Sequence, residues 1–325
     1  MEIVITIGLL VLGIILIVKG GDVFVDAATW MAEVSGIPKF IIGATVVSVA
    51  TTLPELFVSV IAASQGKVDM SIGNAVGSVT ANIGLIMALS LIFIPMAIKR
   101  KDFAVKVSLM MGAALLLVVF GSGGSFGIVP SVLFLCIFAV NVAENIISAK
   151  RAMGKPDPKD TSELDDSLNT TRKTIAVNLA KFILGAAAIV WGADLLVDNG
   201  SKLATIMGVP ERIISVTIIA IGTSLPELVT TITSIVKKQG NLSVGNIIGA
   251  NIIDLTLIMP ICAVVSGGAL PVTQQVGRID LPACLVVGAI AVIPTMITKK
   301  FSRWQGFVLI AVYIVYVIIT TVIVK

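Results

Sequence analysis

The chain has 325 residues, of which 57% are hydrophobic and only 13% charged, and its mean hydropathy is +1.07. A soluble domain carries about 25% charged residues, so this composition excludes an ordinary water-soluble protein and predicts an integral membrane protein. The small net charge of +4 argues against a nucleic-acid partner, and the absence of histidine excludes Ser-His and Cys-His catalytic dyads and histidine metal ligands.

Apolar runs of about 20 residues, long enough to cross a bilayer, predict ten transmembrane helices. In chain order they are expected at residues 3–34, 39–64, 70–98, 103–120 and 126–148, and then at 175–207, 212–236, 242–265, 281–298 and 304–324. The polar residues 149–174 contain two prolines and many charges, which predicts a linker between two halves.

Polar and helix-breaking residues recur at a constant spacing of 172 residues. The stretch from Thr45 to Glu55, with Thr-Thr-Leu-Pro-Glu at its end, matches Thr217 to Glu227, with Thr-Ser-Leu-Pro-Glu. A second stretch, 71–78, matches 243–250 through shared serine, glycine and asparagine residues. Such register indicates an internal repeat. Because each half has an odd number of helices, the second half must enter the membrane from the opposite side, which is the architecture of many secondary transporters.

We therefore predict an all-α membrane protein whose ten transmembrane helices form two inverted-topology five-helix repeats, residues 1–148 and 175–325. Lys and Arg concentrate in alternate connections, such as 99–106, 150–173, 237–238 and 299–303. Basic loops stay on the cytoplasmic side of a membrane. This bias predicts a multi-pass protein of the cell membrane with extracellular N- and C-termini and a cytoplasmic linker at 149–174.

Prolines break predicted helices two and seven close to an acidic residue. Pro54 has no N–H to donate to the carbonyl of Ala50, four residues earlier, and Pro226 has the same effect on Gly222. A carbonyl freed inside lipid needs a partner, which is either a neighbouring hydroxyl or a bound cation. Each break thus offers a carboxylate, hydroxyl oxygens and backbone carbonyls in one place.

The segments 71–82 and 243–254 are expected to line the same centre. Their Gly-xxx-Gly spacing predicts close helix contacts. Ser78 and Asn82 share one face of the first segment, and Asp254 lies at the position of Asn82 in the second. Helix–helix hydrogen bonding and ion binding are both open roles for Ser78 and Asn82. Asn74 and Asn246 are expected to brace the breaks.

Three acidic residues, Glu55, Glu227 and Asp254, therefore lie at membrane depth with no Lys or Arg near them in their helices. Ionisable groups in this position usually mark a function. An oxygen-only ligand set suits hard cations such as Ca²⁺, Na⁺ or Mg²⁺. Because the carboxylates repel one another when no cation is bound, competing cations or protons would share them, which is a physical basis for exchange.

These motifs resemble the alpha repeats of the sodium/calcium exchanger family, within the cation/calcium exchanger superfamily. The carriers of the resemblance are residues 43–84 and 215–256, and the short linker resembles that of prokaryotic members. The resemblance implies a secondary active antiporter that exchanges Ca²⁺ for Na⁺ by alternating access. It further implies that long helices one and six slide across a core made by the other eight.

The resemblance also implies ion-binding roles for individual residues. The Ca²⁺ site would use Glu55, Glu227, Thr51 and Thr223. One Na⁺ site would use Glu227, Thr51, Ser78, Ser224 and the Ser48 carbonyl. The other would use Glu55, Thr52, Thr223 and the Ala220 carbonyl. Asn82 and Asp254 would occupy the middle position.

Two departures from the family pattern leave the coupling ion open. Ala250 stands where the second repeat usually has a serine, which puts one Na⁺ site in doubt, and Asp254 resembles the potassium-dependent branch. The alternatives are therefore an H⁺/Ca²⁺ exchanger, a K⁺-dependent Na⁺/Ca²⁺ exchanger and, in a different class, a cation channel. No enzyme signature is present. We expect no cofactor and no obligate protein partner, with the lipid bilayer and the transported ions as the only partners.

Overall fold

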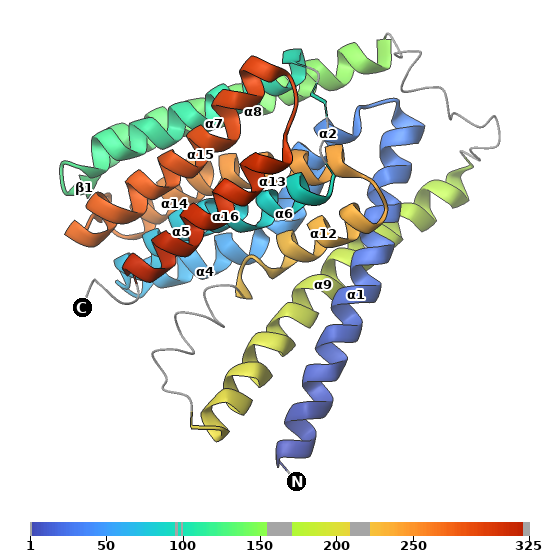
Figure 1. Cartoon of the computed structure of the whole chain (residues 1–325), viewed down its shortest axis with the longest axis horizontal. Coiled ribbons are helices and arrows are strands. Elements are labelled where there is room, and N and C mark those ends of the chain that lie inside the picture. The colour runs from blue at the N-terminus through green and yellow to red at the C-terminus, as the bar shows by residue number, and fades with distance from the viewer. Residues whose placement is uncertain (1, 95–96, 99, 155–170, 209–221, 321–325) are drawn as a thin grey trace.

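The computed structural model describes residues 2–94, 97–98, 100–154, 171–208 and 222–320, which form a nearly all-helical bundle (Figure 1). Within these residues, seven helices are long and apolar enough to cross a membrane, or eight if one bent helix pair counts as a single span. Two shorter apolar helices, Leu225–Val236 and Arg303–Ile318, accompany them. The chain is therefore a multi-pass helical membrane protein.

The helices of the first half, in which η denotes a π-helix, are α1 (Glu2–Ser35), α2 (Lys39–Ile42), η1 (Gly43–Val47), α3 (Ser48–Thr51), α4 (Leu53–Ser64), α5 (Val68–Ala81), η2 (Asn82–Met87), α6 (Ala88–Phe93), α7 (Arg100–Gly121) and α8 (Ile128–Gly154). Those of the second half are α9 (Arg172–Ile206), α12 (Leu225–Val236), α13 (Gly240–Ile253), η4 (Asp254–Ile258), α14 (Met259–Val265), η5 (Val276–Asp280), α15 (Leu281–Thr298) and α16 (Arg303–Ile318). Two short strands, β1 (Ser125–Phe126) and β2 (Leu270–Pro271), pair in antiparallel fashion.

Several predicted boundaries were wrong. The third helix ends at Phe93 rather than at residue 98, because Ile94 precedes a proline and adopts an extended conformation (φ −126°, ψ 78°). The ninth begins at Val276, five residues earlier than predicted, through the π-helical turn η5. The predicted first part of the seventh helix, 212–221, lies outside the described residues.

The two helices that flank the predicted linker at 149–174 extend into it. Helix α8 continues to Gly154, and α9 begins at Arg172. Alanine, lysine, arginine and methionine at 149–153 are good helix formers. The charges of Lys150 and Arg151 therefore do not end the helix.

The bend in the second helix is confirmed. The segments Lys39–Thr51 and Leu53–Ser64 meet at 45°. Thr52 between them has φ −87° and ψ −1°, so the chain turns there and α4 starts with proline in its first turn. Proline is favoured at this position because the first N–H groups of a helix have no intrahelical partner.

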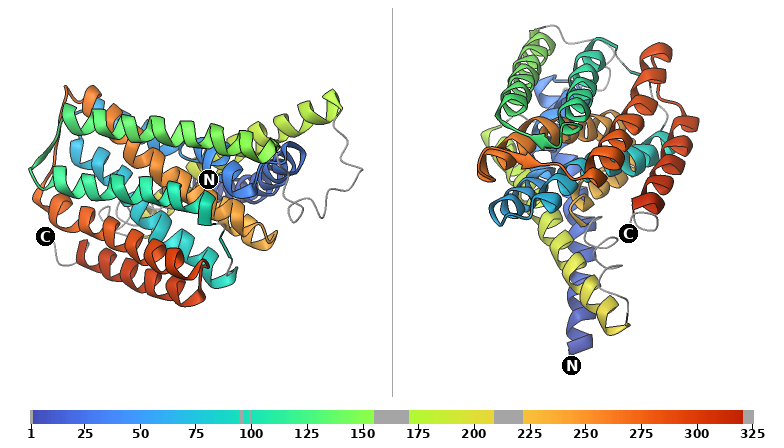
Figure 2. Two further views of the ribbon diagram at one scale, coloured as in Figure 1. Left: turned by 90° about the horizontal axis from the view of Figure 1, so that it is seen from above. Right: turned by 90° about the vertical axis from the view of Figure 1, so that its left-hand side faces the viewer.

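Helices α1 and α9 form the most extensive helix pair and extend together beyond the rest of the bundle (Figure 2). They touch backbone to backbone at two levels, where Gly13 meets Gly192 and Gly20 meets Gly185. A methyl group on Gly13 would lie 2.9 Å from the Gly192 carbonyl oxygen, so only glycine permits this approach. Since one residue number rises as the other falls, the two helices run antiparallel.

Helix α13 lies at the centre of the bundle and packs closely on α2 and η1. Added methyl groups would lie 2.1 Å from the Phe40 carbonyl at Gly245, and 2.7 Å from the Ala44 backbone at Gly249. The predicted close contact of this small-residue face is therefore confirmed. The equivalent Gly73 and Gly77 of α5 meet nothing within 4 Å among the described residues.

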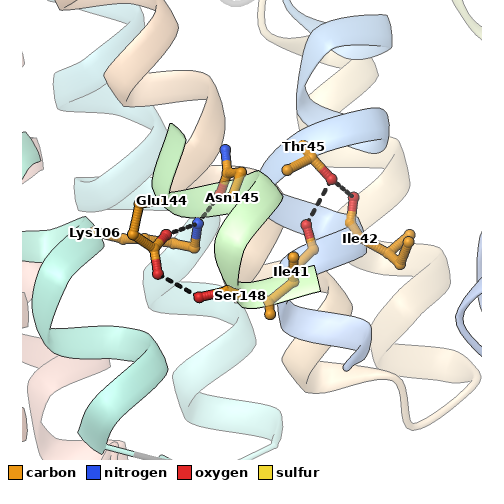
Figure 3. Close-up of polar contacts among 7 residues, drawn as sticks. All are labelled: Ile41, Ile42, Thr45, Lys106, Glu144, Asn145 and Ser148. Carbon is orange, nitrogen blue, oxygen red and sulfur yellow. Dashed lines mark hydrogen bonds and ion pairs between the residues drawn. The ribbon is translucent and has the colours of Figure 1, made fainter. Parts of the chain in front are cut away.

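An ion pair joins α7 to α8 beside η1 (Figure 3). The fully buried Lys106 Nζ lies 2.9 Å from Glu144 Oε2 and also donates to Asn145 Oδ1. Ser148 donates to the other Glu144 oxygen at 2.5 Å. Because both charges are satisfied by neighbouring side chains, a buried lysine is tolerated at this place.

Candidate functional site

The two predicted helix breaks have the same backbone geometry. Ser224, at the position equivalent to Thr52, has φ −90° and ψ 10° and is followed by α12, which also starts with Leu-Pro-Glu. Each acidic residue therefore lies in the first turn of a helix, where free N–H groups and the helix dipole favour a negative charge. In the first break, the preceding short helix α3 directs its carbonyl end toward the same point.

The three predicted acidic residues are brought together in the interior. The exposed fractions of Glu55, Glu227 and Asp254 are 1%, 0% and 0%. Glu55 lies within electrostatic reach of both other carboxylates. Among the residues that the structure describes, no basic side chain pairs with any of them, and both oxygens of Glu55 and Asp254 have no hydrogen-bond partner.

Contacts cross between the two motifs. Thr52 Oγ1 donates to Glu227 Oε1 at 3.4 Å, and Thr51 also lies near this carboxylate. Ser224 of the second motif lies close to Glu55. Its hydroxyl is 3.3 Å from the Ser78 hydroxyl of α5. The hydroxyls of each motif thus face the carboxylate of the other.

Asn82 and Asp254 each begin a π-helical turn, η2 and η4, within a longer helix. Such π-turns are frequent at functional sites because they disturb the regular hydrogen-bond ladder. Asn82 Nδ2 donates to Asn251 Oδ1 at 3.1 Å, so its amide nitrogen joins η2 to α13. Its Oδ1 has no partner in the described part of the chain, so helix pairing engages only the amide nitrogen.

Three further predicted ligands are the Ser48 carbonyl, Thr223 and the Ala220 carbonyl. The Ser48 carbonyl already accepts the Thr52 N–H at 3.0 Å and the Thr51 hydroxyl at 3.4 Å. Thr223 is half-buried in the turn before α12. Ala220 lies outside the described residues.

The two bracing asparagines behave differently. Asn74 donates to the Glu55 carbonyl at 3.2 Å and to the Ser59 hydroxyl at 2.9 Å, so it braces the start of α4 as predicted. Asn246 instead accepts a hydrogen bond from Thr51, in the other half, at 3.1 Å. It therefore links the two motifs rather than supporting its own.

This centre offers oxygen ligands, but its acidic side chains alone do not surround a metal site. No group of three Asp, Glu or Cys side chains within the described ranges is close enough to hold one metal ion. A hard cation would therefore take most of its ligands from hydroxyl, amide and carbonyl oxygens, with one or two carboxylates supplying the charge.

The family profile described as "Sodium/calcium exchanger protein" matches residues 5–146 and 177–322. The chain belongs to the sodium/calcium exchanger family. This family is one of ion exchangers, and membership agrees with the resemblance of the two motifs.

Relatives of this exchanger cover nearly the whole chain. The Sodium/calcium exchanger MaX1 of Methanosarcina acetivorans is 28% identical over 96% of this chain and 97% of its own. An uncharacterized membrane protein of Methanocaldococcus jannaschii is 30% identical over 95% and 96%, respectively. A solved structure of the sodium-calcium exchanger NCX_Mj, soaked with Na⁺ and Sr²⁺, matches with a TM-score of 0.79 and 27% identity over 98% of this chain and 99% of that one.

Sequence reasoning missed parts of the exchanger's centre. Asn251 has no polar counterpart in the first half, where Val79 occupies its position, so the repeat comparison passed over it. The π-turns have no signature in composition. Gly13 and Gly185, like Gly20 and Gly192, are 172 residues apart, and that spacing could have revealed the α1–α9 contact.

Proposed function

We propose that this exchanger is a secondary active antiporter that moves Ca²⁺ against Na⁺ by alternating access, without a resident cofactor. The observation that carries the proposal is the pair of equivalent Leu-Pro-Glu helix starts, each with a buried carboxylate close to a hydroxyl of the other motif. Unpaired buried carboxylates at such a place need a cation or protons. The relatives named for sodium/calcium exchange support Ca²⁺ and Na⁺ as the ions.

In this proposal Ca²⁺ binds between Glu55 and Glu227 and takes further oxygens from Thr51 and Thr223. One flanking Na⁺ site uses Glu227, Thr51, Ser78, Ser224 and the Ser48 carbonyl, and the other uses Glu55, Thr52, Thr223 and the Ala220 carbonyl. Asn82 and Asp254 lie between them. In the structure Thr52 contacts Glu227 and Ser224 lies close to Glu55, so these two hydroxyls must exchange carboxylates for the sites to form. Use of the Ser48 carbonyl requires that one of its two hydrogen bonds be released.

The proposed architecture is ten transmembrane helices in two inverted five-helix repeats. The glycine contacts support it, because Gly13–Gly192 and Gly20–Gly185 exchange places when the two repeats are exchanged. Contacts between connections support it too: Phe126 pairs with Leu270, while Ile98 donates to the Lys299 carbonyl at nearly equivalent positions. The loop charges favour extracellular termini.

The test is Ca²⁺ uptake into proteoliposomes with Na⁺, K⁺ and H⁺ gradients imposed one at a time. We expect uptake to require an outward Na⁺ gradient and to be abolished by Glu55→Gln. Glu33→Gln is the matched control, because Glu33 pairs with Lys39 at the end of α1, away from the site. Uptake that ignores Na⁺, or full activity of Glu55→Gln, would refute the proposal.

Specific residues favour the alternatives. Ala250 removes a hydroxyl from the second half, which favours H⁺ as the coupling ion, and Asp254 favours a K⁺ requirement. Uptake driven by a pH gradient without Na⁺ would select the first, and a K⁺ requirement the second. Single-channel conductance steps without a counter-ion requirement would select a cation channel.

A further inference from the structure

One side of α12 carries polar groups that the proposed ion site does not use. Thr230 and Ser234 follow Glu227 by three and seven residues, so the three lie along one side of the helix. All are fully buried. Glu227 Oε2, Thr230 Oγ1 and Ser234 Oγ have no hydrogen-bond partner among the described residues. We call Thr230 and Ser234 the α12 stripe.

Most fully buried hydroxyls in the described residues have a hydrogen-bond partner, although that of Ser71 in α5 also lacks one. Other buried helical threonines, Thr80, Thr256 and Thr295, donate to the carbonyl four residues earlier. A buried polar group without a partner costs free energy. The fold does not demand the α12 stripe, because the equivalent positions of α4 carry Val58 and Ala62.

The stripe ends at an ion pair that holds α1. Lys237, ten residues after Glu227, has all three of its partners on that helix. Its Nζ lies 2.7 Å from Asp26 Oδ1 and 3.5 Å from Asp22 Oδ1, and it donates to the Asp22 carbonyl at 2.9 Å. Thr233 lies one turn before Lys237 on α12. There Gly21 of α1 packs so closely that a methyl group on it would lie 2.8 Å from Thr233 Oγ1.

The equivalent end of the first half lacks this closure. Gln65 replaces Lys237, and among the described residues no ion pair forms with Asp194 or Asp198, the counterparts of Asp22 and Asp26. Val229 and Thr233, which contact α1, are each 9% exposed. Their counterparts on α4, Phe57 and Ile61, are 60% and 53% exposed.

We propose that the α12 stripe is the route for cations between Glu227 and the membrane face at which Lys237 lies, and that the Lys237–Asp22–Asp26 ion pair holds α1 over this route. The inference rests on the proposed function. It identifies the ion pair that closes access to the ion site from the membrane face at which Lys237 lies. Hydroxyl oxygens suit a partly hydrated Na⁺ or Ca²⁺. Once the Lys237 ammonium is withdrawn, it no longer neutralises the two aspartates at the end of the route, and they attract cations.

Thiol accessibility tests this proposal directly. Cys136 is exposed, whereas Cys262 and Cys284 are buried, so Cys136→Ser gives a background with little reactivity. In that background Ser234→Cys reports on the route, with a membrane-impermeant, positively charged methanethiosulfonate applied separately to each side of vesicles. Lys238→Gln is the matched control, because Lys238 is exposed and has no ion pair with a described residue.

We expect the Ser234→Cys thiol to be labelled slowly. Adding Lys237→Gln should raise its labelling rate about fivefold, for reagent applied from one side only, because a partly exposed ion pair contributes only a small free energy. The charge exchange Lys237→Asp with Asp26→Lys should return the rate toward the slow value. An unchanged rate in Lys237→Gln, or an equal increase in Lys238→Gln, would overturn the inference. If Lys237→Gln does not fold, Asp26→Asn serves in its place with the same expected increase.

Labelling requires no ion gradient, so it separates the two proposals. Ca²⁺ uptake that ignores Na⁺ would overturn the proposed antiport and leave the labelling rates to decide the role of the ion pair. Na⁺-driven uptake with unchanged labelling in Lys237→Gln would overturn only the ion-pair inference.

Discussion

Substitution of Lys106 by methionine should destabilise the protein, because it leaves the largely buried Glu144 carboxylate without its ion-pair partner. Methionine keeps the length and apolar character of the side chain but removes the ammonium. The Lys106 side chain is 0% exposed and the Glu144 side chain 16%. Loss of one partner of a buried ion pair costs about 3–5 kcal/mol. Because Glu144 keeps its Ser148 hydrogen bond and some exposure, we expect the lower end, about 3 kcal/mol.

At the unfolding entropy typical of a chain of this length, this loss lowers the Tm by about 4 °C. Tryptophan fluorescence of the purified protein during heating in detergent measures it. Lys106→Met combined with Glu144→Gln removes both charges and should recover most of the loss. Lys150→Met, on the exposed side of α8, is the control and should leave the Tm unchanged. A double variant as unstable as Lys106→Met would refute the reasoning, since the loss would then not arise from the stranded carboxylate.

Three further predictions concern the centre of the bundle. Gly245→Ala, whose methyl group would lie 2.1 Å from a backbone carbonyl of α2, should cost about 1–3 kcal/mol in thermal unfolding, whereas Gly77→Ala should cost little. Asn251→Ala removes the acceptor of the Asn82 amide and should cost about 0.6–2 kcal/mol, with a double-mutant cycle between the two showing coupling. Ala250→Ser returns a hydroxyl to the second half and should lower the Na⁺ concentration that half-saturates Ca²⁺ uptake; an unchanged or higher value would exclude a role for this position.

The features that could be predicted from the sequence are those set by local covalent chemistry. Proline at 54 dictates a bend because it lacks an N–H, and the bend was found at Thr52, between the proline and the Ala50 carbonyl that it frees. Glu55 and Glu227 stand out because acids are rare in apolar runs. The repeat showed that Glu55 and Glu227 are equivalent and led us to expect them at one centre, and the structure places them there, buried and within electrostatic reach.

What could not be predicted depends on contacts between distant segments. The repeat suggested that Asn74 and Asn246 act alike, yet Asn246 bonds Thr51 of the other half. The π-turns at Asn82 and Asp254 depend on hydrogen-bond register, which residue types do not specify. The extension of α8 to Gly154 was missed because polarity marks the end of a membrane span and not of a helix.

The two glycine contacts between α1 and α9 bear on how the protein would avoid letting ions leak through the membrane. Helices that touch backbone to backbone at two levels have little freedom to roll or splay, so a shift of one carries the other with it. If α1 and α9 move as one rigid pair, the pair cannot cover α12 at one end of the bundle and α4 at the other end at the same time. In the proposed alternating-access mechanism, the two ends therefore do not open through independent movements of the two helices. The contact between α1 and α9 would then guard against an open pore that dissipates the ion gradient.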